Sequence, residues 1–325
     1  MNWFVEILKA IGLAALLFTF LAVVAAMFGV LLERKIGGWI QSRLGPKHVG
    51  PQGLFQTLAD TVKLLQKEHI TPYAADPAIF NTAPLIVATA GLMDWVVIPF
   101  GTIGTLVLVV RDLNIGVLFF SAMASMTVVG ILAGGWASNN KYSMLGALRS
   151  ASQMISYELP LATALIAVAM EAGTLSTVGI VRAQAGWLGS FVVRQFPAFV
   201  IFMIAATAEV NRVPFDLPEA ESELVAGYFS EYTGMRFALF QLGEYAEMFA
   251  MAAMATTLFL GGWKGPVLPP LIWFLIKMYL VVFFLMWMRW TYPRFRLDQL
   301  LNLSWKLLLP AGLLWILITG YRLTN

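Results

Sequence analysis

A carboxylate-rich stretch between two apolar runs is the part of the sequence whose residue types are best suited to chemistry. The stretch, residues 209–231, reads EVNRVPFDLPEAESELVAGYFSE and contains a third of the chain's 18 acidic residues. Its six carboxylates and single cation are Glu209, Asp216, Glu219, Glu221, Glu223 and Glu231, with Arg212. Carboxylates held this close repel one another, so they share protons and their titrations are coupled. We therefore predict that this stretch takes up and transfers protons.

A purely structural explanation covers only part of this stretch. Pro218 suits the first turn of a helix, and carboxylates in the opening turns of a helix complement its positive end. That explanation accounts for one or two of the three glutamates that follow Pro218, but not for six acids opposed by one arginine.

Further charged residues lie inside long apolar runs. They are Glu158, Glu244, Glu247 and Lys277. Charged groups at such depth usually face a bundle interior or a water-filled cavity, and they often mark a proton or ion path. A structural ion pair, such as Lys277 with a glutamate, is the alternative for any one of them. Asp94 and Glu171 lie nearer the ends of apolar runs, and we expect them to reach interfacial water.

The overall composition indicates an integral membrane protein. Of the 325 residues, 59% are hydrophobic and 12% are charged, whereas a soluble domain carries about 25% charged residues. The small net charge of +3 follows from basic loops and does not indicate a surface for nucleic acid. The chain has no cysteine, which excludes disulfides and cysteine-ligated iron–sulfur clusters or zinc, and it has only two histidines. We expect no redox centre in this chain.

We predict an all-α polytopic membrane protein, a single domain over residues 1–325 with about eight transmembrane helices. A bilayer core of about 30 Å takes about 20 apolar residues per helix. The candidate spans are approximately 8–32, 80–100, 113–136, 154–170, 195–208, 237–260, 271–288 and 307–321. The fifth has only 14 residues, so we expect it to be tilted or continued by the acidic stretch. The first apolar run is long enough to suit a span better than a cleavable signal.

The distribution of lysine and arginine predicts the orientation. Of these 21 residues, 14 lie in loops that follow odd-numbered spans, and six lie in the termini and the other loops. Cytoplasmic loops carry the excess of basic residues. We therefore expect both termini on the outside, and cytoplasmic positions for the loop 33–79 and the acidic loop 209–236.

The loop 33–79 contains a candidate amphipathic helix. Apolar residues recur there at helical spacing, at Leu54, Phe55, Leu58, Val62 and Leu65, and charged residues fall largely on the other side. Such a pattern is typical of a helix that lies in the membrane interface. We predict that this helix forms the floor of an opening through which a lipid-soluble molecule enters sideways. A helix that merely packs on the bundle is the alternative.

Several sequence strings, read together, resemble a known family. They are LLERKIGG at 31–38, RLGPKHVGPQGLFQTLADTVKLLQKE at 43–68, WASNNKYSMLGALRSASQMISYELP at 136–160, EVNRVPFDLPEAESELVAGYFSEYTGMRF at 209–237, GGWKGP at 261–266 and RFRLDQLLNLSWKLLLP at 294–310. The chain resembles, end to end and in matching order, the H-subunit family of bacterial respiratory complex I, the proton-translocating NADH:quinone oxidoreductase. The acidic loop is the most specific of these strings.

The resemblance implies site residues in two groups. The first group lines or frames a quinone tunnel and comprises Arg34, Arg43, Asp60, Lys63 and Arg212. The second group transmits quinone chemistry to proton channels and comprises the six carboxylates of the acidic stretch, followed by Glu158 and Glu244 deeper in the membrane. Asp94 and Glu247 match no position that the resemblance carries over, so their roles stay open.

The resemblance also implies the surroundings of the chain. Quinone is the substrate, no cofactor is bound covalently, and FMN and iron–sulfur clusters belong to partner subunits only. The expected partners are peripheral-arm subunits next to the quinone site, neighbouring membrane-arm subunits and lipid, with no nucleic acid. The expected location is the bacterial cytoplasmic (inner) membrane.

Two alternative functions differ from this expectation. A homologous subunit of an ion-pumping membrane-bound hydrogenase has similar spans without needing quinone, but the full loop 33–79 and the intact acidic loop favour complex I. A passive membrane anchor predicts few carboxylates within the spans, and this chain has several. A free-standing secondary transporter is disfavoured because the sequence shows no inverted repeat.

Overall fold

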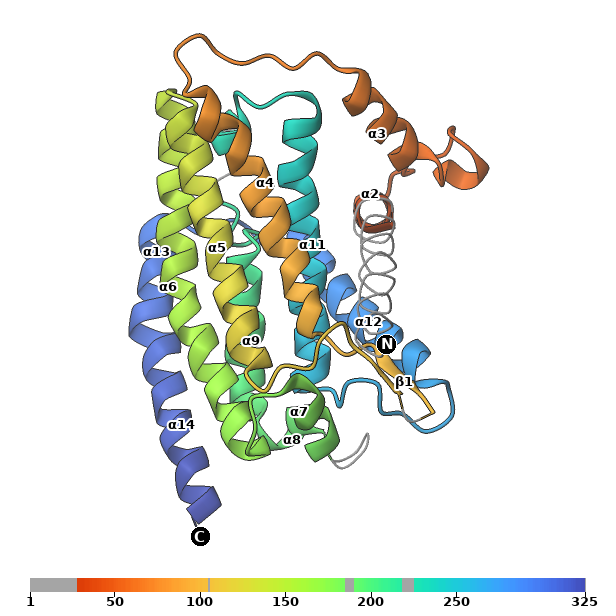
Figure 1. Cartoon of the computed structure of the whole chain (residues 1–325), viewed down its shortest axis with the longest axis vertical. Coiled ribbons are helices and arrows are strands. Elements are labelled where there is room, and N and C mark those ends of the chain that lie inside the picture. Colours follow the sequence, from red (N-terminus) through yellow and green to blue (C-terminus); the bar gives the residue numbers. More distant parts are fainter. Residues whose placement is uncertain (1–27, 105, 185–189, 218–224, 325) are drawn as a thin grey trace, which may run out of the picture.

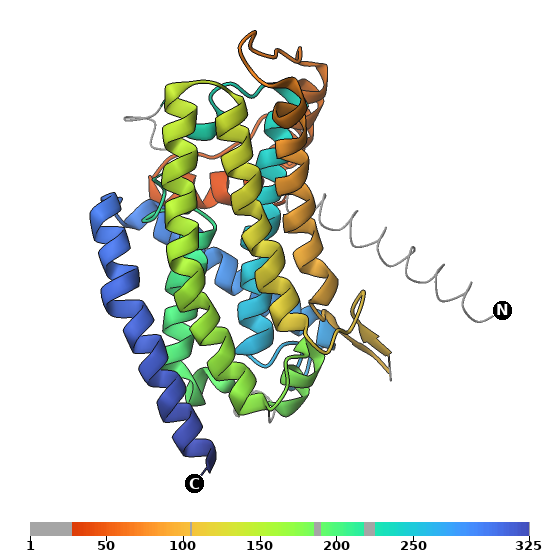
Figure 2. The same ribbon diagram turned by 60° about the vertical axis from the view of Figure 1, so that its left-hand side comes forward.

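The described part of the chain is a bundle of long helices in a computed structural model (Figures 1 and 2). The structure describes residues 28–104, 106–184, 190–217 and 225–324. The main helices of the bundle are α4 (Pro77–Met93), α5 (Gly116–Ala137), α6 (Lys141–Ala172), α9 (Phe196–Glu209), α11 (Gly234–Leu258) and α12 (Pro270–Thr291). Shorter elements join them: α7 (Thr177–Ala183), α8 (Phe191–Arg194) and an antiparallel hairpin of β1 (Gly101–Ile103) and β2 (Leu106–Leu108).

The C-terminal helix is continuous although its geometry changes along its length. It consists of α13 (Leu297–Leu303), one π-helical turn (Ser304–Leu308) and α14 (Leu309–Thr324). It packs along α6 at the edge of the bundle (Figure 2). Most of its apolar residues therefore stay exposed, as expected of a helix that faces lipid.

The all-α polytopic architecture predicted from the sequence is confirmed. Among the described residues, five helical segments are long and apolar enough to cross a membrane: Pro77–Val97, Gly116–Ala137, Lys141–Ala172, Pro270–Thr291 and Leu297–Thr324. The number of eight spans stays a prediction. The helix α9 is apolar but has 14 residues, α11 carries two carboxylates within its length, and most of the first predicted span lies outside the described residues.

The helix α6 is much longer than the predicted span at 154–170. It has 32 residues because residues 141–153, in which polar and apolar side chains alternate irregularly, continue the helix, and the side chain of Asn140 caps its start by accepting a hydrogen bond from the Tyr142 amide. It ends at Gly173, whose φ of 68° is the left-handed conformation that commonly closes helices.

The core surrounds α11, which lies at the centre of the bundle. Every residue from Tyr245 to Leu258 is buried, and most of them are alanine, methionine or phenylalanine. A helix that is apolar all round is buried on all sides. The carboxylates on this helix are therefore held inside protein and not in lipid.

The helices α2 (Val30–Ile40) and α3 (Gln56–Gln66) lie beside the main bundle. An extended segment leads from α3 over one end of the bundle to α4 (Figure 1). The Thr233 side chain bonds this segment to the start of α11: its hydroxyl donates to the Glu68 carbonyl and accepts from the Ile70 amide, both at 3.2 Å. These contacts position α3 next to α11.

Three charged residues near helix ends differ from the sequence expectations. Asp94 is fully buried, so the expectation that it reaches interfacial water is wrong. The Glu171 side chain is only 7% exposed and forms ion pairs with Arg194 and Arg322 at 3.7 and 3.4 Å, partners that the sequence did not indicate. Lys277 donates hydrogen bonds of 2.6–3.0 Å to three backbone carbonyls at residues 260, 262 and 264. It therefore holds the loop after α11 in place, in contrast to the ion pair considered from the sequence.

Candidate functional site

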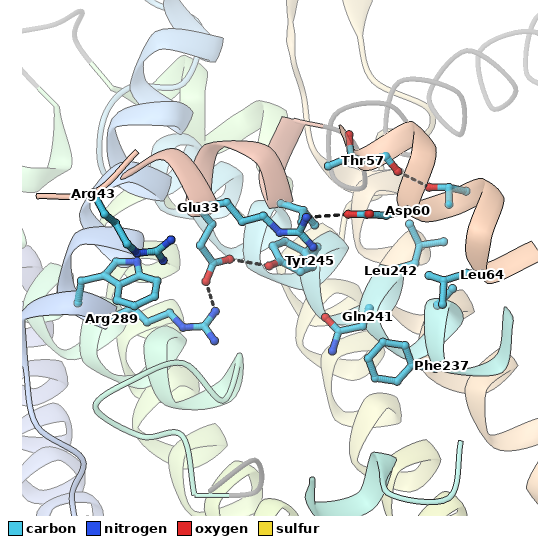
Figure 3. Close-up of a pocket in the computed structure, with 15 residues that line it drawn as sticks. Glu33, Arg43, Thr57, Asp60, Leu64, Phe237, Gln241, Leu242, Tyr245 and Arg289 are labelled. Atoms are coloured by element: carbon cyan, nitrogen blue, oxygen red, sulfur yellow. Dashed lines mark hydrogen bonds and ion pairs between the residues drawn. The ribbon is translucent and has the colours of Figure 1, made fainter. Parts of the chain in front are cut away.

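A cavity of about 430 Å³ lies between α2, α3, α11 and α12 (Figure 3). Its lining residues are Val30, Glu33, Arg34, Arg43, Thr57, Asp60, Thr61, Leu64, Phe237, Ala238, Gln241, Leu242, Tyr245, Arg289 and Trp290. Figure 3 shows Glu33, Arg43 and Arg289 on one side and Leu64, Phe237 and Leu242 on the other. One wall is therefore charged, and the opposite wall carries the apolar side chains together with the polar Asp60 and Gln241.

Glu33 is the centre of the charged wall. Its Oε2 accepts a hydrogen bond of 2.6 Å from the Tyr245 hydroxyl. Its carboxylate also accepts from Arg212 Nη1, at 3.0 and 3.2 Å, and forms an ion pair with Arg289. Two arginines share this one buried carboxylate, which leaves the wall with net positive charge and several hydrogen-bond donors.

The short distance between α2 and α12 at this wall depends on a glycine. A Cβ atom on Gly37 would lie 2.6 Å from the indole of Trp290, closer than side chains pack. The absence of a side chain at Gly37 therefore lets α2 carry Glu33 to Arg289 on α12.

An ion pair between α2 and α3 forms the rim of the cavity. Arg34 Nη1 lies 2.6 Å from Asp60 Oδ2, and Gln56 donates to the other Asp60 oxygen at 3.1 Å. Arg43 stands at the same rim and bonds to Gln41 at 2.6 Å. A second hollow, of about 540 Å³, adjoins this rim and shares Arg34 and Arg43 with the cavity.

The helix α3 presents two different faces. Thr57, Thr61 and Leu64 line the cavity, whereas the apolar residues that define the predicted amphipathic face stay exposed. Those exposed residues are Leu54, Phe55, Leu58, Val62 and Leu65. The helix α3 therefore packs against the bundle through its other face, and its place in the membrane interface stays a prediction.

Arg212 connects the cavity to the carboxylates of the bundle. Besides Glu33 it forms an ion pair of 3.1 Å with Glu244 on α11, and its guanidinium lies 4.6 Å from the centre of the Tyr245 ring. The Arg212 and Glu33 side chains are each only 6% exposed. The single cation of the acidic stretch thus pairs with two glutamates from other elements.

A row of carboxylates continues from Glu244 into the bundle. Glu244 has Glu247 as its electrostatic neighbour, and Glu247 has Asp94 and Glu209. Glu209 in turn has Glu158, whose carboxylate accepts a hydrogen bond from the Ser125 hydroxyl. Both oxygens of Glu209 are buried and have no hydrogen-bond partner among the described residues.

The other predicted residues of the acidic stretch have separate positions. Asp216 forms an ion pair of 3.0 Å with Arg294, so a cation from a distant part of the sequence opposes it. Glu231 accepts a hydrogen bond of 2.6 Å from Asn140. Glu219, Glu221 and Glu223 lie outside the described residues.

The structure thus brings together most of the residues predicted to bind the ligand. Arg34, Arg43 and Asp60 line the cavity, Arg212 lies directly behind it, and Lys63 lies on the exposed side of α3 outside the lining. Sequence reasoning missed Glu33, Tyr245 and Arg289. The position of Glu33 beside Arg34, at the end of an apolar run, could have indicated a role for it. Nothing in the sequence pairs it with Arg289, however, which is 256 positions away.

No residues in the described ranges could form a metal site of three or more histidine, cysteine or carboxylate side chains. The lining instead offers arginine donors at one wall and apolar side chains, with the Gln241 amide among them, at the other. Such a cavity suits an amphipathic molecule with a flat polar head and an apolar tail, because a few convergent polar groups orient a ligand that apolar walls bury.

Comparisons with known proteins agree with this chemistry. A sequence model described as NADH dehydrogenase matches residues 13–320. One NADH-quinone oxidoreductase H subunit of Geobacter sulfurreducens, the form numbered 2, is 50% identical over 315 residues, which cover 95% of this chain and 94% of that protein. The H subunit of Geobacillus kaustophilus is 50% identical over 318 residues, covering 95% and 92%. The H subunit numbered 2 of Syntrophobacter fumaroxidans is 48% identical over 325 residues, covering 98% and 97%.

Proposed function

The chain belongs to the NADH dehydrogenase family, and on this premise we propose that it is the H-type membrane subunit of an NADH-quinone oxidoreductase. Relatives with that name are 50% identical to this chain over nearly their full lengths. In this proposal the cavity between α2, α3, α11 and α12 receives the quinone headgroup. The carboxylate row then links quinone reduction to proton movement.

The observation that carries the proposal is the pairing of a charged and an apolar wall in one cavity, with carboxylates directly behind the charged wall. Quinone reduction takes two electrons and two protons and places negative charge on the headgroup oxygens. Arg43 and Arg289 supply N–H donors for those oxygens, and Leu64 and Phe237 would contact the isoprenoid tail. Charge that develops in a site of low dielectric interacts strongly with fixed donors.

The connection to proton movement rests on Arg212. New negative charge in the cavity competes with Glu33 and Glu244 for this one guanidinium, since both carboxylates already bind it. Any loss of its pairing with Glu244 favours proton uptake at Glu244, because an unpaired buried carboxylate is costly. At an effective dielectric of about 20, charges a few ångströms apart interact by a few kcal/mol, which is enough to move protons between neighbours.

In this proposal the quinone reaches the cavity from the membrane through an opening beside α3. The exposed apolar face of this helix is suited to the membrane interface, and its other face borders the cavity. A quinone would then enter sideways between α2 and α3. The ion pair of Arg34 and Asp60 stands at this opening.

The proposal extends to the location of the chain and to its partner subunits. The chain would lie in the bacterial inner membrane with both termini periplasmic, next to peripheral-arm and membrane-arm subunits. FMN and iron–sulfur clusters would reside in those partners. Glu219, Glu221 and Glu223 would take up or release protons when the charge at the quinone site changes, and they would exchange these protons with the carboxylate row.

Replacing Arg34 with Ala tests the opening. This change is expected to lower quinone reductase activity in the assembled complex, while NADH oxidation with a water-soluble acceptor persists. Exposed ion pairs contribute only about 0–1 kcal/mol to stability, and the Arg34 side chain is 47% exposed, so assembly should survive. Arg111→Ala, an exposed arginine on the loop after β2, is the control. Equal loss of both activities in assembled Arg34→Ala would count against the proposal.

A further inference from the structure

Two carboxylates of the row to which the proposed function gives no separate role are electrostatic neighbours where α4 ends against α11. The two helices approach closely just before this point, since a Cβ atom on Gly91 would lie 2.8 Å from the Gly243 carbonyl oxygen. One turn further along each helix stand Asp94 and Glu247. The neighbouring indole of Trp95 donates a hydrogen bond of 3.2 Å to the Ala246 carbonyl and fixes the two backbones relative to each other.

Both side chains are buried and lack partners. Asp94 is 0% exposed and Glu247 is 4% exposed. Neither oxygen of Asp94 has a hydrogen-bond partner within the described residues, and the same holds for Oε1 of Glu247. Buried polar atoms are almost always hydrogen-bonded, so three unpartnered oxygens at one place indicate a bound species.

The charges that surround the pair are all negative. The electrostatic neighbours of Glu247 are Asp94, Glu209 and Glu244, and the neighbour of Asp94 is Glu209. The nearest cation in the row, Arg212, is engaged by Glu33 and Glu244. Two adjacent buried carboxylates cannot both stay ionised under these conditions, because desolvation and like-charge repulsion act together.

We propose that Asp94 and Glu247 form a proton-storing carboxyl pair within the carboxylate row, between Glu244 and Glu209. A proton on either residue gives the pair an O–H donor and an acceptor, which satisfies oxygens that are otherwise unpartnered. Gln241, Glu244 and Glu247 follow one another at three-residue spacing on α11. Gln241 and Glu247 therefore lie about 9 Å apart along the helix axis, and Tyr245, which also lines the cavity, stands between them.

The competing occupant is a monovalent cation, which two carboxylates could also hold. The proton is favoured because, among the described residues, the junction itself holds only Asp94 and Glu247, and Glu209 is their neighbour. No set of three suitable side chains in the described ranges qualifies as a metal site. Hard cations take six or more oxygen ligands, several of them usually carbonyls or waters.

Infrared spectroscopy of the purified, assembled complex tests for the stored proton. The wild-type complex should show a carboxylic-acid C=O stretching band at neutral pH in sodium-free buffer. Asp94→Asn and Glu247→Gln should each remove or shift that band, so either variant suffices if the other fails to assemble. Glu171→Gln is the matched control, because Glu171 is a buried carboxylate paired with two arginines.

Two outcomes would overturn the proposal. One is an unchanged band in both Asp94→Asn and Glu247→Gln. The other is a band in the wild-type complex that disappears when sodium is added, since that result would assign the pair to a cation. Neither measurement depends on quinone turnover, so failure here is distinguishable from failure of the proposed function.

A second readout asks whether the stored proton takes part in turnover, and this part rests on the proposed function. In reconstituted vesicles, Asp94→Asn should lower the number of protons moved per quinone reduced, with quinone reduction less affected. Glu171→Gln should leave the ratio unchanged. An unchanged ratio in Asp94→Asn, with the infrared band lost, would refute the pair's part in proton movement.

Discussion

Replacing Arg212 with Met is expected to abolish most quinone reductase activity and to lower assembly of the complex. The substitution leaves Glu33 and Glu244 buried without their shared partner. Breaking a buried ion pair in this way costs roughly 3–5 kcal/mol. Native gel electrophoresis measures assembly, and NADH:quinone turnover per assembled complex measures the effect on the site.

Two companion variants separate the role of the ion pair from a general effect of losing an arginine. Arg182→Met removes an exposed arginine on α7 and should change neither quantity. Adding Glu244→Gln to Arg212→Met removes the carboxylate that loses its ion pair with Arg212, so assembly should partly recover, as expected for coupled neighbours. Normal turnover in Arg212→Met would show that the guanidinium does not connect the cavity to the row.

Replacing Leu242 with Trp is expected to block the cavity. Leu242 is on the apolar wall, across from Glu33 (Figure 3). A larger side chain there occupies the volume that the proposed ligand needs, and overpacking of this kind costs roughly 1–3 kcal/mol, equivalent to about 5- to 150-fold in affinity. The KM for quinone should rise accordingly, whereas NADH oxidation with a water-soluble acceptor should persist.

The control for this prediction is Leu118→Trp, which adds the same bulk at an exposed position on α5. It should leave the KM for quinone unchanged. A normal KM for Leu242→Trp in the assembled complex would place the quinone elsewhere.

The helical architecture could be predicted from the sequence because a long apolar run is a local feature of the sequence. The cores of α5, α9 and α12 match the predicted spans within a few residues. The start of α6 was missed because polar side chains such as Lys141, Arg149 and Gln153 interrupt the apolar residues of its first turns, which leaves no long apolar run. Burial of those turns depends on contacts with other elements, which hydropathy does not report.

The site was only partly accessible for the same reason. The acidic stretch and Arg34 were recognisable from local strings, but Glu33 acquires its role from Arg212 and Arg289, which are 179 and 256 positions away. Asp94 was misplaced because its position near the end of an apolar run indicates nothing about the helix that covers it. The close approach of α4 and α11 is a tertiary feature.

Photo-crosslinking with an azido-quinone in the assembled complex tests the central claim most directly. The competing location is an apolar groove of about 590 Å³ between α9 and α12, lined by residues such as Phe199 and Phe284. The proposal predicts that the label attaches to peptides from α2 or the first half of α11, and that unlabelled quinone competes with it. Label confined to α9 and α12, or to other subunits only, would contradict the assignment of the quinone site to this cavity.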